Sequence, residues 1–160
     1  MSMSYKNLAD NTRVWVYQSN RPFSIQEAEL IQEQGKMFLK RWSAHGAKLN
    51  AAFEIIHNLF VALFVDEEQA KATGCSIDKS VHLIKSFEKE FAIKLLDRNY
   101  VAFRAGKDIL VLSRRQFLEK VRKGELNHDT TVFNNLVSTK KEFETKWEVP
   151  LKESWYYEMI

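Results

Sequence analysis

Hydrophobic and polar positions alternate with two different periods along the first part of the chain. The segment VWVYQS (14–19) has the period of two and the β-branched and aromatic residues that are typical of a strand. After it, SIQE (24–27) forms a capping box, and apolar residues three and four apart predict a helix. Gly46 suits the left-handed conformation that ends helices, so we expect this helix to stop near it.

The middle of the chain predicts two strands followed by a second helix. Residues 48–68 predict two strands, with a turn at 57–58. The second strand, 59–65, has almost no polar residues, so we expect it at the centre of a sheet. A second helix is expected to start near Ser76 or Asp78.

The last part of the chain begins with a hairpin signal. Gly106 and Lys107 separate two strand-like runs within 99–113. The capping box SRRQ (113–116) then predicts a short helix that ends at Gly124. In the tail, 125–160, we expect a helix over about 130–147 and an aromatic end that packs on the body as a strand or last turn.

The order of these elements is β-α-β-β-α-β-β-α, followed by the tail. Hairpins mixed with crossover helices predict an α+β fold with a mainly antiparallel sheet and helices on one face. The first six elements fit the split β-α-β arrangement of ferredoxin-like folds. We expect a single domain over 1–160. Within it, we expect a flexible segment over residues 1–12.

Composition narrows the class of protein. The chain has 160 residues, of which 45% are hydrophobic and 28% charged, as in globular domains. No apolar run approaches the roughly 20 residues of a membrane span, so we expect no membrane insertion. The start has no apolar core of a secretion signal, and Cys75 is the only cysteine, so we expect a cytoplasmic protein.

Two fragments invite an ATPase interpretation, which their residues do not support. VALFVDEE (61–68) looks like a Walker B strand, and GCSIDKS (74–80) looks like the end of a P-loop. Aligning the Lys-Ser pair with the end of the P-loop places Thr73 and Asp78 where the loop needs glycines. The apolar strand also precedes the loop, the reverse of the usual order. We therefore expect no P-loop ATPase.

Three segments carry a resemblance to a known family: VWVYQSNRPFS, RWSAHGAKLNAAFEI and ATGCSIDKSVHLIK. They resemble a family of small uncharacterised bacterial proteins that often carry the automated label "ABC transporter ATPase". The resemblance covers most of the chain. It implies no established activity, and the residues discussed above do not support the label.

Cys75 is the candidate for a catalytic nucleophile. It lies just before the expected helix start, where the helix dipole favours a thiolate, and Lys79 adds positive charge one turn later. His45 is a candidate base if the fold brings it near. The alternatives are a buried packing role for Cys75 and a helix-capping role for His45. The four histidines and one cysteine lack ligand spacing, so we expect no metal site, and no cofactor motif is present.

Two surfaces are candidates for binding. In the first strand, Trp15 and Tyr17 face away from the two neighbouring valines, and Arg21 follows in a turn, which suits a pocket for a ligand or partner. A sheet covered on both sides is the alternative. Asp66, at the end of the apolar strand, and Lys79 are further candidate contacts.

The basic segment 104–123, with Arg114 and Arg115, suits binding to RNA. Residues 71–123 carry 13 basic and 6 acidic residues, whereas the rest of the chain has a small acidic excess, so the net charge of +3 arises in this part. Lysines on solvated helix faces would give the same pattern. The segment lacks the Gly-rich aromatic motif of RNA-binding sheets. The sequence therefore favours a non-enzymatic module that binds a ligand or a protein. A thiol-dependent enzyme using Cys75 is the alternative, and RNA binding is third.

Overall fold

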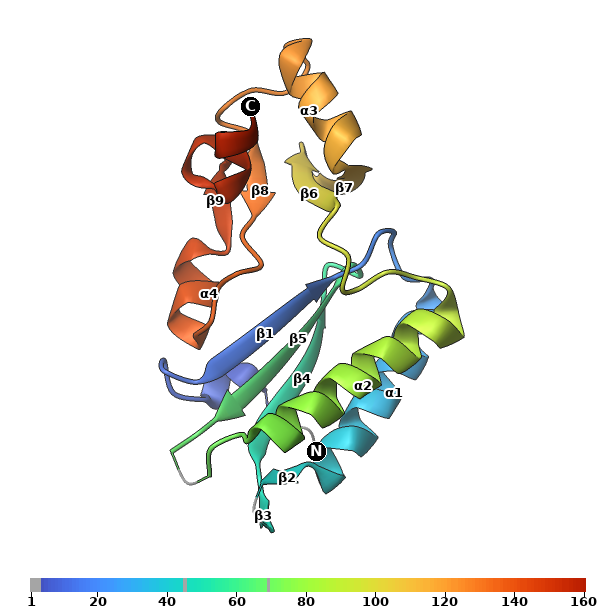
Figure 1. Ribbon diagram of the computed structural model, residues 1–160, viewed down its shortest axis with the longest axis vertical. Helices are drawn as coiled ribbons and strands as arrows, with labels where there is room; N and C mark the ends of the chain where they lie inside the picture. The colour runs from blue at the N-terminus through green and yellow to red at the C-terminus, as the bar shows by residue number, and fades with distance from the viewer. Residues whose placement is uncertain (1–3, 45, 69) are drawn as a thin grey trace.

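A computed structural model describes residues 4–44, 46–68 and 70–160, which form two larger antiparallel sheets, a short hairpin and helices (Figure 1). The fold is therefore α+β, as the sequence predicts. In chain order, the described elements are η1 (Tyr5–Asn7), β1 (Arg13–Gln18), α1 (Ile25–Arg41), β2 (Ser43–Ala44), β3 (Ala47–Lys48), β4 (Asn50–Ile56), β5 (Phe60–Asp66), α2 (Gly74–Phe91), β6 (Tyr100–Ala105), β7 (Asp108–Ser113), α3 (Arg114–Arg122), β8 (Thr131–Phe133), α4 (Lys140–Lys146), β9 (Glu148–Pro150), η2 (Leu151–Glu153) and η3 (Trp155–Met159).

The first sheet has the strand order β1-β5-β4. Its central strand is β5, in which every residue from Phe60 to Val65 is buried, so the prediction from the apolar run is confirmed. The turn between β4 and β5 is also where the sequence predicts it. His57 and Asn58 both have positive φ, at 53° and 55°, as tight hairpin turns require.

Both faces of this sheet are buried. The helices α1 and α2 lie side by side across one face (Figure 1). Ile31 of α1, Phe87 of α2 and Leu63 of β5 belong to the same buried core on that side. On the other face, Tyr5 of η1 stacks on Phe64 with ring centroids 4.6 Å apart, and α4 and β8 complete the cover. The apolar character of β5 on both sides follows from this arrangement.

The second sheet has the order β7-β6-β8-β9. Its first two strands form the expected hairpin, and Gly106 takes the positive φ of 64° in the turn. The helix α3 starts from β7 with the predicted capping box and packs Phe117 against Phe103, with ring centroids 5.5 Å apart. The core of this sheet includes Tyr156 from the aromatic end of the chain.

The ferredoxin-like expectation holds for the first five predicted elements and fails at the sixth. Strands β1, β4 and β5 have the split β-α-β order, with α1 and α2 on one face. In a ferredoxin-like fold the strand after α2 would pair with the free edge of β1. Here that strand, β6, pairs with β7 along one edge and with β8 along the other, so neither of its edges is available to β1. Among the residues that the structure describes, no full partner strand covers the edge of β1.

Several predicted boundaries need correction. The second helix begins at Gly74, because Thr73 is its N-cap and forms a reciprocal capping box with Ser76. The helix α1 ends at Arg41, and Gly46 has its positive φ in the short β2–β3 hairpin.

The tail also differs from the single helix expected over 130–147. It contains β8, which pairs Val132 with Phe103 of β6, and then α4, which is capped by Thr139. The aromatic end forms η3 and packs on the second sheet. At the other end of the described chain, Leu8 and Thr12 are buried, so these two residues of the segment 4–12 contribute to the core.

Candidate ligand-binding cleft at the edge of β1

The free edge of β1 is only partly covered. The amide of Val14 donates to the carbonyl of Ser138 at 3.0 Å, and Arg13 forms a bridge with Thr139. The amide of Val14 therefore points away from β5. Because hydrogen-bonding direction alternates along an antiparallel strand, the backbone N–H and C=O of Val16 also point to the free edge.

No residue in the described part of the chain makes a hydrogen bond to the backbone of Val16 on that side. The segment that pairs with Arg13 does not continue along β1. It turns away instead, where the amide of Val137 contacts the carbonyl of Asn134. An unpaired stretch of sheet edge therefore begins directly after the covered one.

A cleft of about 340 Å³ lies along this unpaired stretch. This volume is near the lower end of the range for small-molecule sites in proteins. One wall is β1, and the others come from the linker between α2 and β6, from the loop before α4 and from the start of η3. The lining residues are Arg13–Gln18, Leu95–Arg98, Tyr100, Asn135–Ser138, Trp155 and Tyr156.

A chain of side-chain hydrogen bonds holds the walls together. The indole Nε1 of Trp147 donates to Oδ1 of Asn135 at 2.9 Å, and Nδ2 of Asn135 donates to Oε1 of Gln18 at 2.9 Å. Nε2 of Gln18 then donates to the carbonyl of Tyr100 at 3.1 Å. Each amide has both of its ends bonded, so β1, the loop before α4 and β6 are fixed relative to one another.

Arginine side chains flank the aromatic lining. The guanidinium of Arg13 lies 4.5 Å from the ring centroid of Trp15, and that of Arg114 lies 5.2 Å from the ring of Trp155. Arg98 is exposed, and its side chain makes no ion pair or hydrogen bond with the described residues. The cleft thus combines aromatic surface with positive charge.

The remaining titratable groups of the cleft add little negative charge. Asp97 is the acidic residue of the lining; its carboxylate accepts a hydrogen bond from the amide of Asn99 at 2.9 Å and lies 3.8 Å from Nζ of Lys94. Burial raises the pKa of Tyr17, and it raises the pKa of Tyr156 to about 12. Both phenols are therefore neutral at neutral pH and are able to donate hydrogen bonds.

Trp15 and Tyr17 are the two sequence-predicted binding residues that line the cleft. They lie on the helix-covered side of the sheet, and Val14 and Val16 lie on the opposite side, as the alternation predicts. Their position on the edge strand leaves each of them half-buried.

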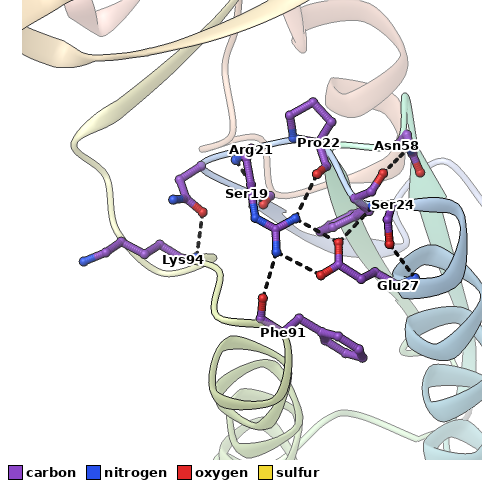
Figure 2. Close-up of polar contacts among 10 residues, drawn as sticks. Ser19, Arg21, Pro22, Ser24, Glu27, Asn58, Phe91 and Lys94 are labelled. Carbon is purple, nitrogen blue, oxygen red and sulfur yellow. Dashed lines mark hydrogen bonds and ion pairs between the residues drawn. The ribbon is translucent and has the colours of Figure 1, made fainter.

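Arg21 does not line the cleft, because its guanidinium is bound elsewhere (Figure 2). It donates to both carboxylate oxygens of Glu27 at 2.8 Å and to the carbonyls of Phe91 and Pro22. The pKa of Glu27 falls to about 2, chiefly through the hydrogen bonds from Arg21. This junction ties the start of α1 to the end of α2, so the contacts of Arg21 are accounted for structurally. Its predicted role in ligand binding stays untested.

Of the two residues proposed for thiol chemistry, the structure describes Cys75. Cys75 is exposed in the first turn of α2 and does not line the cleft. His45 lies outside the described residues. Asp66 accepts a hydrogen bond from the amide of Glu68 at 3.0 Å, in a turn at the end of β5. The thiol-dependent enzyme therefore stays a prediction.

Lys79 is exposed on α2 and also lies outside the cleft. The whole stretch 74–80, compared above with a P-loop, is helical. A phosphate-binding loop needs consecutive backbone amides in a curled, non-helical segment, which this stretch does not provide.

In the basic segment 104–123, several charges are paired. Arg104 forms an ion pair with Glu148, and Lys120 lies 2.8 Å from Glu125. Arg114 stacks on Trp155 beside the cleft, whereas Arg115 is exposed on α3. Many of these residues therefore have protein partners, and RNA binding stays an untested prediction.

Arg98 and Asn135 line the cleft although no sequence pattern marks them as part of a site. Both lie in connecting segments that have no periodic pattern, and packing brings them to β1 from distant parts of the chain. Trp155 belongs to the aromatic end that the sequence predicts to pack on the body, but only the three-dimensional arrangement shows that it borders a cleft together with Tyr100.

Neither a metal site nor a membrane span is found in the part of the chain that the structure describes. Over 4–44, 46–68 and 70–160, no three His, Cys, Asp or Glu side chains are grouped to hold a metal ion. None of the helices in these ranges has the length and apolar character to cross a bilayer.

Comparison of the chain with family models, curated proteins and solved structures finds no match. The resemblance to the small bacterial family therefore stays a prediction.

Proposed function

We propose that the protein is a non-enzymatic binding module whose ligand occupies the cleft along β1. The observation that supports this most directly is the meeting of Trp15 and Tyr17 with Arg98 and Trp155 around one cleft of about 340 Å³. Ligand sites combine apolar and aromatic surface with a few placed polar groups, and this cleft has both. We expect the module to act in the cytoplasm, in line with its single, exposed cysteine.

The charges of the cleft favour an anionic ligand. Arg98 lines it without a side-chain partner among the described residues, and Arg13 lines it 3.5 Å from Glu67. Asp97 interacts with Lys94 and with the amide of Asn99. Arginine guanidinium groups bind carboxylates and phosphates through paired hydrogen bonds. The aromatic side chains that line the cleft, among them Trp15 and Trp155, would contact the uncharged part of the same ligand.

An NMR screen tests this proposal. The ¹⁵N-labelled protein is titrated with small carboxylates, organic phosphates and short peptides, and backbone and indole resonances are followed. We expect shifts that cluster at β1, at the linker around Arg98 and at the indole of Trp155. Binding should weaken about tenfold in Arg98→Glu, because the exposed guanidinium becomes a repelling carboxylate.

Arg41→Glu is the matched control for the screen, because Arg41 is an exposed arginine at the end of α1 outside the cleft. It should bind as the wild type does. Absence of clustered shifts at the cleft with every compound, or equal weakening by both substitutions, would refute the proposal.

A further inference from the structure

We infer that the ligand of this cleft is an extended acidic peptide segment, which adds to β1 as an antiparallel strand. This inference rests on the proposed function and specifies the ligand. Its starting point is the backbone of Val16, whose N–H and C=O face the cleft and make no hydrogen bond with the described residues. Unpaired backbone groups on a sheet edge are the template for strand addition.

The same edge already carries a strand partner at its first residues. Thr139 bridges Arg13, and the carbonyl of Ser138 accepts from the amide of Val14. A peptide would continue this pairing from Val16 toward Gln18, over the stretch that the loop before α4 leaves open. These residues span roughly 7–10 Å at the rise of an extended strand, which corresponds to three or four peptide residues.

The side walls fit a strand rather than a compact molecule. In an added strand, alternate side chains point to opposite faces of the sheet. On the helix-covered side they would meet Trp15 and Tyr17, and the exposed Arg98 would lie within the lining of the same cleft. Acidic peptide side chains would therefore be preferred over basic ones, because Arg98 has no partner among the described residues, whereas Arg13 pairs with Glu67 and Asp97 pairs with Lys94.

The exposed edge of β7 provides an internal comparison. The amide of Ser113 points away from β6, since it donates to the side chain of Gln116, and by alternation the amide of Val111 points the same way. Val111 also lies on a free edge, yet it lines neither the β1 cleft nor the hollow beside α3. Strand addition that needs the cleft should occur at Val16 and not at Val111.

Selection of displayed random peptides of about eight residues on the full-length protein tests the inference, because this length spans all of β1. We expect enriched sequences rich in Asp and Glu. The affinity of a synthetic selected peptide should fall at least about tenfold in Val16→Pro, which removes the outward N–H, and should be unchanged in Val111→Pro. Proline is tolerated on edge strands where the N–H faces outward, and the NMR spectrum of each variant checks its fold.

Methylated peptides test the same point without altering the protein. N-methylation of the alternate amides that face β1 should lower affinity at least about tenfold, whereas methylation of the intervening amides should have little effect. Equal binding by Val16→Pro, insensitivity to methylation or failure to enrich any peptide would overturn the inference. If small anions still shift the cleft resonances in that case, the ligand is a small molecule and the proposed function stands.

Discussion

Two arginine-containing regions lie near β1 and differ in how their polar groups are used. In the junction of Arg21, the guanidinium donates to Glu27 and to two backbone carbonyls, so its hydrogen-bonding capacity is largely filled by the protein (Figure 2). In the cleft, Arg98 has no side-chain partner among the described residues, and the backbone of Val16 is unpaired on one side. The hydrogen-bonding groups of the Arg21 junction are bound within the protein, whereas Arg98 and the backbone of Val16 are available to a ligand.

The comparison shows why residue type alone does not separate structural from functional positions. Arg21 follows an aromatic strand and precedes a helix, which makes it an attractive candidate for ligand contact. Its carboxylate partner, Glu27, is also visible in the sequence, but only as half of a capping box. The contact with the carbonyl of Phe91 depends on how α1 and α2 pack together.

The largest expected effect comes from removing the junction. Arg21→Ala should lower the free energy of unfolding by about 2 kcal/mol, because it deletes a bidentate charged pair and leaves the carbonyl of Phe91 without its donor. Urea denaturation followed by far-UV circular dichroism measures this change. Ligand binding in the cleft should be unaffected at temperatures where the variant is folded.

Arg98→Ala is the matched substitution in the cleft. It should change the free energy of unfolding by less than about 0.5 kcal/mol, since its side chain has no partner among the described residues. If Arg98→Ala destabilises the protein as much as Arg21→Ala does, the distinction between the two regions fails.

A smaller, pH-dependent effect is expected at Glu27. Its pKa is about 2 in the folded protein, against an ordinary value of 4.5, and the hydrogen bonds from Arg21 are the largest cause of this lowering. The carboxylate therefore stabilises the fold above about pH 4.5, and this stabilisation is lost as the pH falls toward 2. Glu27→Gln should lower the free energy of unfolding by only about 1 kcal/mol at pH 7, because Arg21 is partly exposed and solvent screens the pair. Near pH 2 the substitution should have a much smaller effect, because the carboxylate of the wild type is then becoming protonated.

Glu29→Gln is the control for this titration, because Glu29 is exposed on the same helix and has no ion pair among the described residues. Its effect on stability should be small at both pH values. A difference between wild type and Glu27→Gln that does not shrink on acidification would contradict the assigned role of the junction.

The parts of the fold that depend on local pattern were predictable from the sequence. Alternation in β1, the apolar run of β5 and the capping boxes at Ser24 and Ser113 act within a few residues, and each element forms where its pattern indicates. The short strand β8 was missed because its three residues are defined by pairing with β6 and β9. The sequence around it predicts a helix over about 130–147 instead.

The cleft was predictable only on its β1 side. Trp15 and Tyr17 follow from a period of two within one strand. The opposite walls come from Arg98 and Asn135, which lie far apart in the chain and meet because β6 joins the second sheet instead of the first. No pattern within the linkers encodes that choice, since it depends on which partners satisfy the edges of β6.

Amide hydrogen exchange measured by NMR on the free protein is the most direct test of the open edge in the cleft. We predict that the amide of Val16 exchanges much faster than those of Trp15 and Tyr17, whose N–H groups point toward β5. The amide of Val14, which donates to Ser138, should be protected by comparison with Val16. If Val16 is protected as strongly as its two neighbours, the edge is already occupied and the cleft cannot accept a strand.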